Sequence, residues 1–388
     1  MKKHIHNYAL NPDAETLDQF KECYEQDFVV EAALMPDAHR GYAAPIGAVL
    51  KTKDVIVPAW VGFDIGCGVS SAELKGRSIL EKIKNNKESI YAKVKELIPM
   101  GKGDIHSSTE PLTKETLDAY NALVEKYEKG THSKEVLNFL KTSGARHLGT
   151  LGDGNHFIEL GTYENEAWIT IHSGSRGLGF KVAKKYMIKT AGAEENYEAT
   201  HPLDVATQLG KEYLAILEFG LEFALLNRME MLRKVTQAIS EVLDEDIVFE
   251  LWVNKNHNHA VPEENFFIHR KGATPAKKGE RGVIPGNMRD GCYLVVGKGN
   301  KDFLESSSHG AGRVLGRKEA KEKISMESFR ESMKDVLGTV TEDTLDEAPS
   351  AYKSISAVME KQKDSVEVVK LLKPLINWKG EGRKKNNQ

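Results

Sequence analysis

The sequence has few cysteines and no long apolar run. Its three cysteines, Cys23, Cys67 and Cys292, are an odd number and lie far apart, which disfavours a disulfide framework. No window approaches the roughly 18 consecutive apolar residues that identify a membrane-spanning helix. The first residues, MKKHIHNYALNPDAET, contain two lysines but no apolar core after them, unlike a cleaved secretory signal. We therefore expect a cytoplasmic protein.

An excess of charge of one sign is also lacking. The 54 lysines and arginines are nearly balanced by 57 acidic residues, which gives a net charge of -3. A protein that coats nucleic acid without specificity relies on a broad basic surface, so this class is disfavoured, whereas a local basic groove is compatible with the composition. With 40% hydrophobic and 29% charged residues, the chain matches a globular protein and not a disordered or fibrous one.

The pattern of apolar residues predicts a mixed α/β fold. Apolar residues at three- and four-residue spacing predict helices at about 78–98, 112–127, 133–142, 203–243, 317–337 and 350–362. Short runs rich in valine, isoleucine and aromatic residues predict strands at about 28–34, 54–60, 167–172, 247–253 and 292–297. No fixed-period repeat or low-complexity tract divides the chain. We expect one large domain over residues 1–388, with central sheets, peripheral helices, a cleft built from loops, a helical insertion at about 184–246 and a polar tail at 381–388.

Six short loops are unusually rich in glycine, histidine, asparagine, aspartate and serine. They cover residues 35–47, 62–68, 149–159, 172–179, 254–259 and 283–313. Loops with this composition usually only turn the chain. Each of these loops, however, also carries a candidate metal ligand or a backbone segment suited to binding phosphate.

The first candidate ligands lie in the segment GFDIGCGV (62–69). Asp64 and Cys67 are three residues apart in a glycine-rich turn that follows an apolar run. A carboxylate and a thiolate that converge there suit a borderline-soft divalent ion such as Mn or Zn. The alternative is a buried cysteine in a tight turn.

Two histidines follow in similar surroundings. In LGTLGDGNHFIEL (148–160), Asn155 and His156 come after a glycine turn, and Glu159 shares a face with His156 only if a helix begins there. His156 is equally compatible with a core position. His172 ends an alternating strand and precedes the run SGSRG, where Arg176 and backbone donors could bind phosphate or simply form a flexible turn.

A second alternating strand leads into LWVNKNHNHA (251–260). In an extended chain His257 and His259 point to the same side and Asn258 to the other, so one histidine could be a ligand and the other a surface residue. Together with the preceding candidates there are too many donors for one tetrahedral ion. They suit two adjacent ions that share a ligand, and a thiolate is able to bridge them. Two-metal sites are the usual arrangement for displacement at phosphorus.

The third glycine-rich region comprises VIPGNMRDGCYLVVG (283–297) and SSSHGAGRVLGR (306–317). His309 follows three serines, where it could be a ligand, a general base or a nucleophile. Arg313 and Arg317 are four residues apart, so a helix starting there would carry both on one face. Tyr352 and Lys379 could each cap a nucleotide, and each taken alone resembles an ordinary surface residue.

In this order, the segments resemble the RtcB family of RNA ligases. The similarity extends from MPDAHRGYAAPIG (35–47) to the pair Lys379–Gly380. The matching segments between them are GFDIGCG, GDGNHFIE, IHSGSRG, His257–Asn258, HRKGA (269–273), HGAGR (309–313), and DEAP and AYK within residues 346–353. Each segment alone is weakly specific, but the ordered set is highly specific. The resemblance implies a GTP- and Mn-dependent enzyme that joins RNA 3′-phosphate or 2′,3′-cyclic phosphate ends to 5′-hydroxyl ends, in RNA repair or tRNA splicing.

The resemblance also implies residue roles. Two Mn ions would be bound by Asp64, Cys67, His156, His172 and His257, with the thiolate as the bridge. His309 would attack the α-phosphate of GTP, and the guanylate would pass from it to the RNA as an RNA-(3′)pp(5′)G intermediate. The guanylate would be held by Asn155, Glu159, Asn258, Pro285, Gly286, Asn287, Met288, Cys292, Gly310, Ala311, Gly312, Tyr352 and Lys379. RNA contacts would come from Arg40, Arg146, Arg176, Lys271 and Arg313.

Three features depart from the family pattern. Where the family has a Gly-Ser/Thr-Met-Gly stretch followed by a serine that touches guanine, this chain has Asn287, Met288, Arg289 and Asp290 leading to Cys292, which bears on nucleotide preference. Ala-Ala-Pro replaces the usual Gly-Phe-Pro after MPDAHRGY, and the chain is shorter than many members. These departures would fit a divergent paralog with a specialised RNA. The remaining alternatives are a two-metal phosphoesterase acting on RNA ends and a non-catalytic RNA-binding paralog.

Overall fold

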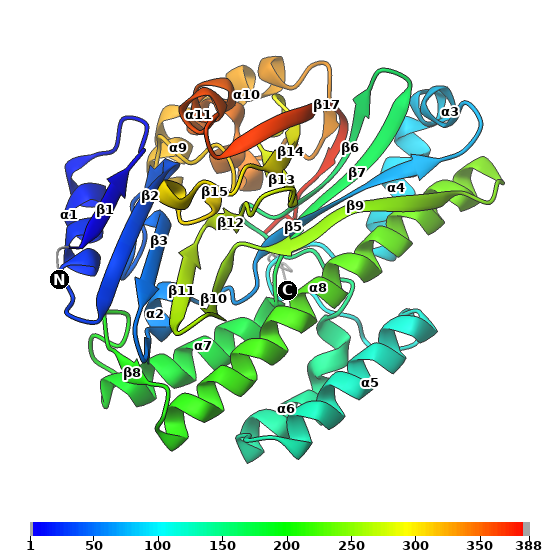
Figure 1. Cartoon of the computed structure of the whole chain (residues 1–388). Coiled ribbons are helices and arrows are strands. Elements are labelled where there is room, and N and C mark those ends of the chain that lie inside the picture. The colour runs from blue at the N-terminus through cyan, green and yellow to red at the C-terminus, as the bar shows by residue number, and fades with distance from the viewer. Residues whose placement is uncertain (1–2, 383–388) are drawn as a thin grey trace.

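Two β-sheets form the centre of the molecule, and the longer helices lie outside them (Figure 1). The computed structural model describes residues 3–382. The smaller sheet has five strands, in the spatial order β1 (His4–Asn7), β2 (Val29–His39), β3 (Ile46–Thr52), β11 (Phe266–Lys271) and β10 (Asn258–Glu263). The larger sheet has the order β13 (Arg281–Pro285), β14 (Cys292–Gly297), β17 (Val366–Trp378), β6 (Phe157–Tyr163), β7 (Glu166–Ser173), β5 (Gly68–Lys75) and β9 (Val248–Asn256), with β16 (Leu337–Gly338) paired to β17.

Two short ladders complete the strands. β12 (Ala273–Pro275) pairs with β15 (Ser306–Ser308), and β4 (Val55–Ile56) pairs with β8 (Leu203–Asp204). The larger sheet curls until its outer strands β13 and β9 contact each other. Trp252 on β9 joins them, because its indole Nε1 donates a hydrogen bond of 3.2 Å to the carbonyl of Gly282 on β13.

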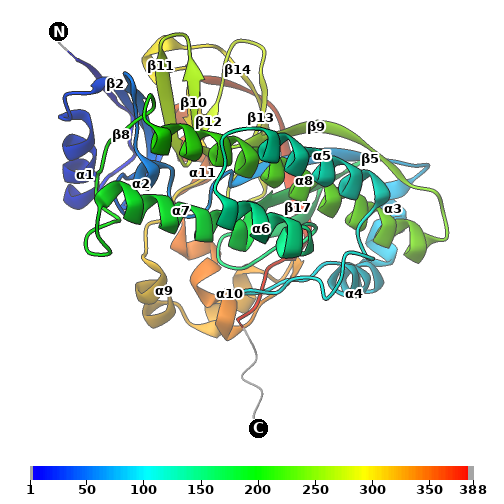
Figure 2. The ribbon, with the colours of Figure 1, turned by 90° about the horizontal axis from the view of Figure 1, so that it is seen from below.

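The longest helix, α8 (Gln208–Leu243), packs against β5, β7 and β9 of the larger sheet. It begins where the hydroxyl of Thr207 accepts a hydrogen bond from the backbone N–H of Gly210, a typical N-cap. Its buried residues Ile216, Phe219 and Phe223 recur three and four positions apart, so this part of the helix has an apolar face. The view from below shows α5 (Lys114–Lys129), α6 (Lys134–Ser143) and α7 (Arg176–Ala191) gathered around it (Figure 2).

The remaining helices are shorter. They are α1 (Ala14–Tyr24), α2 (Pro58–Val61), α3 (Ile79–Asn85), α4 (Lys87–Leu97), α9 (Arg317–Lys323), α10 (Met326–Ser332) and α11 (Ile355–Lys361), with 3₁₀ turns at Gly144–His147, Lys301–Phe303, Glu342–Glu347 and Pro349–Ala351. No helix within residues 3–382 has both the length and the apolarity to cross a membrane.

The predicted mixed α/β fold is confirmed, and most predicted elements are present. The helices expected at 112–127 and 133–142 are α5 and α6, and the strands expected at 28–34, 167–172, 247–253 and 292–297 are β2, β7, β9 and β14. The segment 350–362 contains a 3₁₀ turn and α11. The segment 184–246, expected to be helical, contains the end of α7, the short strand β8 and all of α8.

Other boundaries were wrong for local reasons. The helix expected at 78–98 divides into α3 and α4 at Asn86, whose side-chain amide donates to the Lys82 carbonyl and so competes with the helical pattern. The strand expected at 54–60 ends at Ile56, because Pro58 occupies the first position of the short helix α2. The helix expected at 203–243 begins only at Gln208, and the one expected at 317–337 divides into α9 and α10.

The sequence analysis also missed α1, α7 and the long strand β17. In α7 the two glycines after Arg176 obscured the helical pattern. A Cβ atom at Gly179 would lie 2.0 Å from the Ser175 hydroxyl oxygen, so close packing requires glycine there. Of the predicted polar tail, Glu381 forms a bridge with Gly101, and residues 383–388 lie outside the described residues.

Candidate metal and nucleotide site

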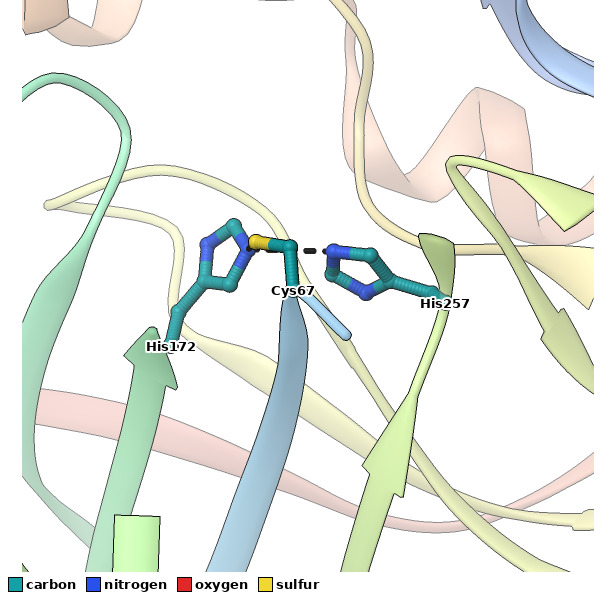
Figure 3. A group of neighbouring side chains, drawn as sticks. All are labelled: Cys67, His172 and His257. Atoms are coloured by element: carbon teal, nitrogen blue, oxygen red, sulfur yellow. Dashed lines mark hydrogen bonds between the residues drawn. The ribbon is translucent and has the colours of Figure 1, made fainter. Parts of the chain in front are cut away.

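Three candidate metal ligands lie at the same end of three adjacent strands. Cys67 directly precedes β5, His172 is the penultimate residue of β7, and His257 follows β9. Because β5 pairs with both β7 and β9, these chain positions lie side by side. The Cys67 sulfur lies 3.2 Å from Nε2 of His172, which lies 3.2 Å from Nε2 of His257, and all three side chains are buried (Figure 3).

A second group of donors includes the same sulfur. Nε2 of His156 lies 3.4 Å from the Cys67 sulfur and 2.9 Å from the Asp64 carboxylate. Asp64 and Cys67 occupy the glycine turn between α2 and β5, and His156 lies immediately before β6. The five residues predicted as metal ligands therefore converge, and Cys67 belongs to both groups.

The chemistry of this donor set fits divalent cations. Burial holds the pKa values of His172 and His257 well below their ordinary value, so both imidazoles are neutral and keep a lone pair. Nδ1 of His156 lies 3.0 Å from the Leu151 carbonyl, an arrangement that places the proton on Nδ1 and leaves Nε2 to face the cluster. Burial and the nearby Asp64 raise the pKa of Cys67 well above its ordinary value, so a bound cation is what would favour the thiolate.

Arg228 on α8 holds together the three strand ends that carry this cluster. Its guanidinium is fully buried and donates to the carbonyl of Gly66 at 3.0 Å, the carbonyl of Ser173 at 2.8 Å and the side-chain oxygen of Asn256 at 2.6 Å. These three acceptors belong to residues that directly adjoin the candidate metal ligands Cys67, His172 and His257 in the sequence (Figure 3). One side chain from a distant helix thus orients the loops of three ligands.

His309 lies beside the cluster and is paired with a buried carboxylate. Its ring centroid is 4.8 Å from that of His257, and its Nδ1 lies 2.6 Å from Oδ2 of Asp37 on β2. The same oxygen accepts backbone N–H groups of His309 and Gly310 at 3.2 and 3.3 Å. Gly312 permits this approach, since a Cβ atom there would lie 2.0 Å from the Asp37 carbonyl oxygen. With Nδ1 facing the carboxylate, Nε2 is the free ring nitrogen.

A second buried carboxylate, that of Glu347, forms ion pairs with three basic side chains of the site. Lys379 lies 2.7 Å from it, Arg317 2.6 Å and Arg313 3.1 Å, and the Tyr352 hydroxyl also donates to it. Burial alone would raise the pKa of Glu347, but these cations outweigh burial and lower it to about 2. No helix carries both arginines on one face, because α9 begins at Arg317, where the predicted helix 317–337 also begins. The two side chains converge through Glu347 instead.

Most of these groups line one cavity of about 780 Å³. His309 and four of the five candidate metal ligands line it, and the fifth, His156, lies behind them. Every residue predicted to hold the guanylate lines it as well: Asn155, Glu159, Asn258, Pro285, Gly286, Asn287, Met288, Cys292, Gly310, Ala311, Gly312, Tyr352 and Lys379. Of the candidate RNA contacts, Arg40, Lys271 and Arg313 line the cavity, whereas Arg146 and Arg176 do not.

Glu159 and Cys292 form a contact inside this cavity. The Cys292 thiol donates to a Glu159 carboxylate oxygen at 3.4 Å, and the Asn377 amide donates to the other oxygen at 3.0 Å. Burial raises the pKa of Glu159 to about 7 in spite of these donors. Cys292 is therefore a partner of this carboxyl group.

Several residues of the site were missed in the sequence. Asp37 and Glu347 lie within segments that were recognised, MPDAHRG and DEAP, but no role was assigned to them. Arg228 gave no signal, because it lies in the middle of a long helix. Of the residues left unassigned, Cys23 and His259 are buried away from the cavity lining, and the His132 ring lies near the Gly130 carbonyl.

Comparison with known proteins gives the family of this chain. A family model described as tRNA-splicing ligase RtcB matches residues 19–380. The chain belongs to the RtcB family. An RtcB relative from Escherichia coli (strain K12), named RNA-splicing ligase RtcB, is 33% identical over 398 residues and is covered to 95%, as is this chain. Another, the tRNA-splicing ligase RtcB of Nanoarchaeum equitans, is 30% identical, with 85% of this chain and 84% of the relative covered. The resemblance of the ordered segments to RtcB is thus confirmed.

Proposed function

We propose that this chain is an RNA ligase that joins RNA 3′-phosphate or 2′,3′-cyclic phosphate ends to 5′-hydroxyl ends, using GTP and two Mn ions. The observation that carries the proposal is the position of His309, held by buried Asp37 in the same cavity as the cluster of metal donors. The names of the relatives, RNA-splicing and tRNA-splicing ligases, support the substrate class. We expect a role in RNA repair or tRNA splicing. A cytoplasmic location stays a prediction from the sequence.

The first step uses His309 as a nucleophile. Nε2 attacks the α-phosphorus of GTP, a P–N bond forms, and the bond to the bridging oxygen breaks so that pyrophosphate leaves with the electron pair. Asp37 faces Nδ1 and stabilises the positive charge that develops on the ring. The product is a guanylate linked to His309.

The next steps transfer the guanylate and join the ends. An oxygen of the RNA 3′-phosphate attacks the guanylate phosphorus, the P–N bond breaks, and His309 is regenerated as RNA-(3′)pp(5′)G forms. The 5′-hydroxyl of the second RNA end then attacks the 3′-phosphorus, loses its proton and displaces GMP. A 2′,3′-cyclic end is first opened by water to a 3′-phosphate. Holding the ends and the guanylate in one cavity makes the joining step effectively unimolecular.

The metal donors would hold the ions against the phosphates. Asp64, Cys67, His156, His172 and His257 would bind two Mn ions, with the Cys67 sulfur shared. Bound cations neutralise negative charge on phosphoryl oxygens. The protein's own contribution is to keep the imidazoles neutral through burial and the ligand loops in place through Arg228.

The polar side of the cavity would hold the guanylate. Lys379 and Tyr352, both bonded to Glu347, line the cavity together with the amide and carboxyl groups of Asn155, Glu159 and Asn258. The backbone of 285–288 and 310–312 lies against the same space. The Glu159–Cys292 pair takes the place of the family's serine at the base, so a preference for GTP over ATP depends on this pair.

The proposal is tested by incubation with GTP labelled at the α-phosphate in the presence of Mn. We expect an acid-labile label on the wild-type chain that is absent from His309→Ala and Cys67→Ala, and present on His259→Ala, a buried histidine outside the cavity lining. RNA with a 3′-phosphate and a 5′-hydroxyl end should then be joined. If the wild-type chain takes up no label from GTP or ATP and instead hydrolyses RNA ends, the protein is a phosphoesterase and the ligase proposal fails. RNA binding that survives His309→Ala and chelation, without any joined product, would indicate a non-catalytic paralog.

A further inference from the structure

Three aromatic side chains from separate segments meet at the opening of the cavity. Tyr42 lies in the loop between β2 and β3, Phe63 follows α2, and Phe180 lies in the second turn of α7. The rings of Phe63 and Phe180 are stacked with centroids 5.1 Å apart, and Tyr42 meets Phe63 edge to face at 5.8 Å. All three line the cavity that contains His309 and Cys67.

This cluster is unusually open to solvent. Tyr42 is 65% exposed and Phe180 is 52% exposed, although single exposed apolar residues on a protein surface need no explanation. Here two such residues share one partly buried neighbour, Phe63, and within residues 3–382 neither has another ring partner. Exposed apolar groups that gather at a cavity are typical of a binding surface.

Lysines lie beside the cluster, together with acidic side chains near Tyr197. Lys181 and Lys184 follow Phe180 on α7, and both are exposed. The Lys184 ammonium lies 5.8 Å from the ring centroid of Tyr197, which in turn meets Phe63 edge to face at 6.5 Å. Aromatic faces flanked by lysines suit a ligand that alternates flat rings with negative charges.

We propose that Tyr42 and Phe180 stack against unpaired RNA bases next to the ends that are joined. The inference rests on the proposed function, because it assigns the RNA side of the same cavity. Base–aromatic stacking tolerates every base, since each has a flat face, and the nearby lysines would meet the adjoining phosphates. The sequence links this surface directly to the site of chemistry, because Phe63 precedes the metal-ligand candidate Asp64. A polar wall around Glu347 holds the guanylate, so the aromatic opening is free for RNA.

The test measures RNA affinity and catalysis separately. Binding of a fluorescent RNA with single-stranded 3′-phosphate and 5′-hydroxyl ends is measured by anisotropy without GTP, and KM for RNA is measured in ligation. Phe180→Ala and Tyr42→Ala should each weaken binding and raise KM by about 5- to 100-fold. Phe180→Trp should retain affinity, and Phe180→Leu, which is apolar but cannot stack, should not. Val368→Ala on β17, an exposed apolar position outside the cavity lining, is the matched control.

A second arm identifies the stacked base. RNAs are prepared that lack the terminal base on the 3′-phosphate side or on the 5′-hydroxyl side, and both should bind more weakly to wild type. For the RNA that lacks the stacked base, Phe180→Ala should cause no further loss of affinity. Label transfer from GTP to His309 should be the same in all variants. If both alanine variants bind RNA within twofold of wild type, the proposal is overturned, and a protein partner becomes the candidate occupant. If His309 is never labelled, the ligase proposal fails, whereas the anisotropy result still decides the stacking proposal.

Discussion

Nδ1 of His309 lies 2.6 Å from Oδ2 of Asp37, although the two residues are 272 positions apart in the chain. The carboxylate has no exposed surface, and it also accepts backbone N–H groups from His309 and Gly310. It therefore sets both the position of the loop and the orientation of the ring. Four predictions follow from this pair and from three other features of the site.

Asp37→Asn should slow guanylate transfer to His309 by about 100- to 10,000-fold. The amide has the size of the carboxyl group, but it carries no charge to stabilise the charged ring, and its N–H can favour the tautomer in which Nε2 is protonated and cannot attack. The measurement is the rate of label transfer from GTP under single-turnover conditions. Asp13→Asn is the control, because Asp13 lines the same cavity but caps α1, a role that asparagine fulfils equally well. A wild-type rate for Asp37→Asn would show that the carboxylate only shapes the loop.

Cys67→Ser should reduce Mn affinity by about 100-fold or more. Loss of a residue that only hydrogen-bonds a metal ligand typically costs about 10- to 100-fold, and loss of a ligand itself should cost more. The physical reason is that both donor groups contain the Cys67 sulfur, so its loss affects both ions. Equilibrium dialysis against Mn gives affinity and stoichiometry. Cys23→Ser provides a matched buried thiol, whose sulfur donates to the Ala43 carbonyl far from the cluster. Equal Mn binding by the two variants would exclude Cys67 as a ligand.

Arg228→Met should weaken both the fold and the metal site. It leaves the Gly66 and Ser173 carbonyls without their donor, which should lower the free energy of unfolding by about 3 kcal/mol. Mn affinity should fall by about 10- to 100-fold, because the ligand loops lose their common anchor. Calorimetric Mn titration and denaturant unfolding measure the two effects. Arg233→Met on the same helix removes a partly exposed guanidinium bonded to the Thr116 hydroxyl and should leave Mn affinity unchanged. If Arg228→Met binds Mn like wild type, its role is confined to stability.

Glu159→Gln should remove one component of the pH dependence of stability. Burial raises the pKa of Glu159 from 4.5 to about 7, so the folded state binds this proton more tightly than the unfolded state does. That contribution is present in full below pH 4.5 and is lost as the pH rises to about 7, by up to about 3 kcal/mol. The glutamine variant should therefore gain stability relative to wild type between pH 4 and pH 8, measured by denaturant unfolding at each pH. Glu73→Gln, an acid on β5 outside the cavity lining, should show no such gain. A constant difference between wild type and Glu159→Gln across this range would mean that the carboxyl group titrates normally.

Much of the site was predictable because its chemistry is local in sequence. Cys67 and His172 each lie where a strand meets a glycine-rich loop, and such loops expose side chains at the end of a sheet, whereas His257 lies between β9 and β10. The amphipathic spacing of α5, α6 and α8 likewise depends only on neighbouring turns of a helix. The corrected elements failed where a single side chain overrides the apolar pattern, as Asn86 and Pro58 do.

The partners of these residues could not be predicted in the same way. The acids that orient His309 and gather the cations come from Asp37 and Glu347, and nothing in their local sequence indicates which distant groups they meet. Arg228 occupies a helix position that a core residue would fill equally well by spacing. Its role appears only when α8 packs under the ends of β5, β7 and β9.

The sequence alone therefore determined which chemical groups this protein carries: candidate histidine and thiol ligands and one nucleophile candidate in a mixed α/β chain. The tertiary structure decided how those groups are paired, charged and opened to solvent, including the buried Asp37, the cations on Glu347 and the aromatic rings at the cavity opening. The physical reason is that spacing along a chain fixes local geometry, whereas pairing and desolvation arise from contacts between segments that meet only when the sheets and helices pack.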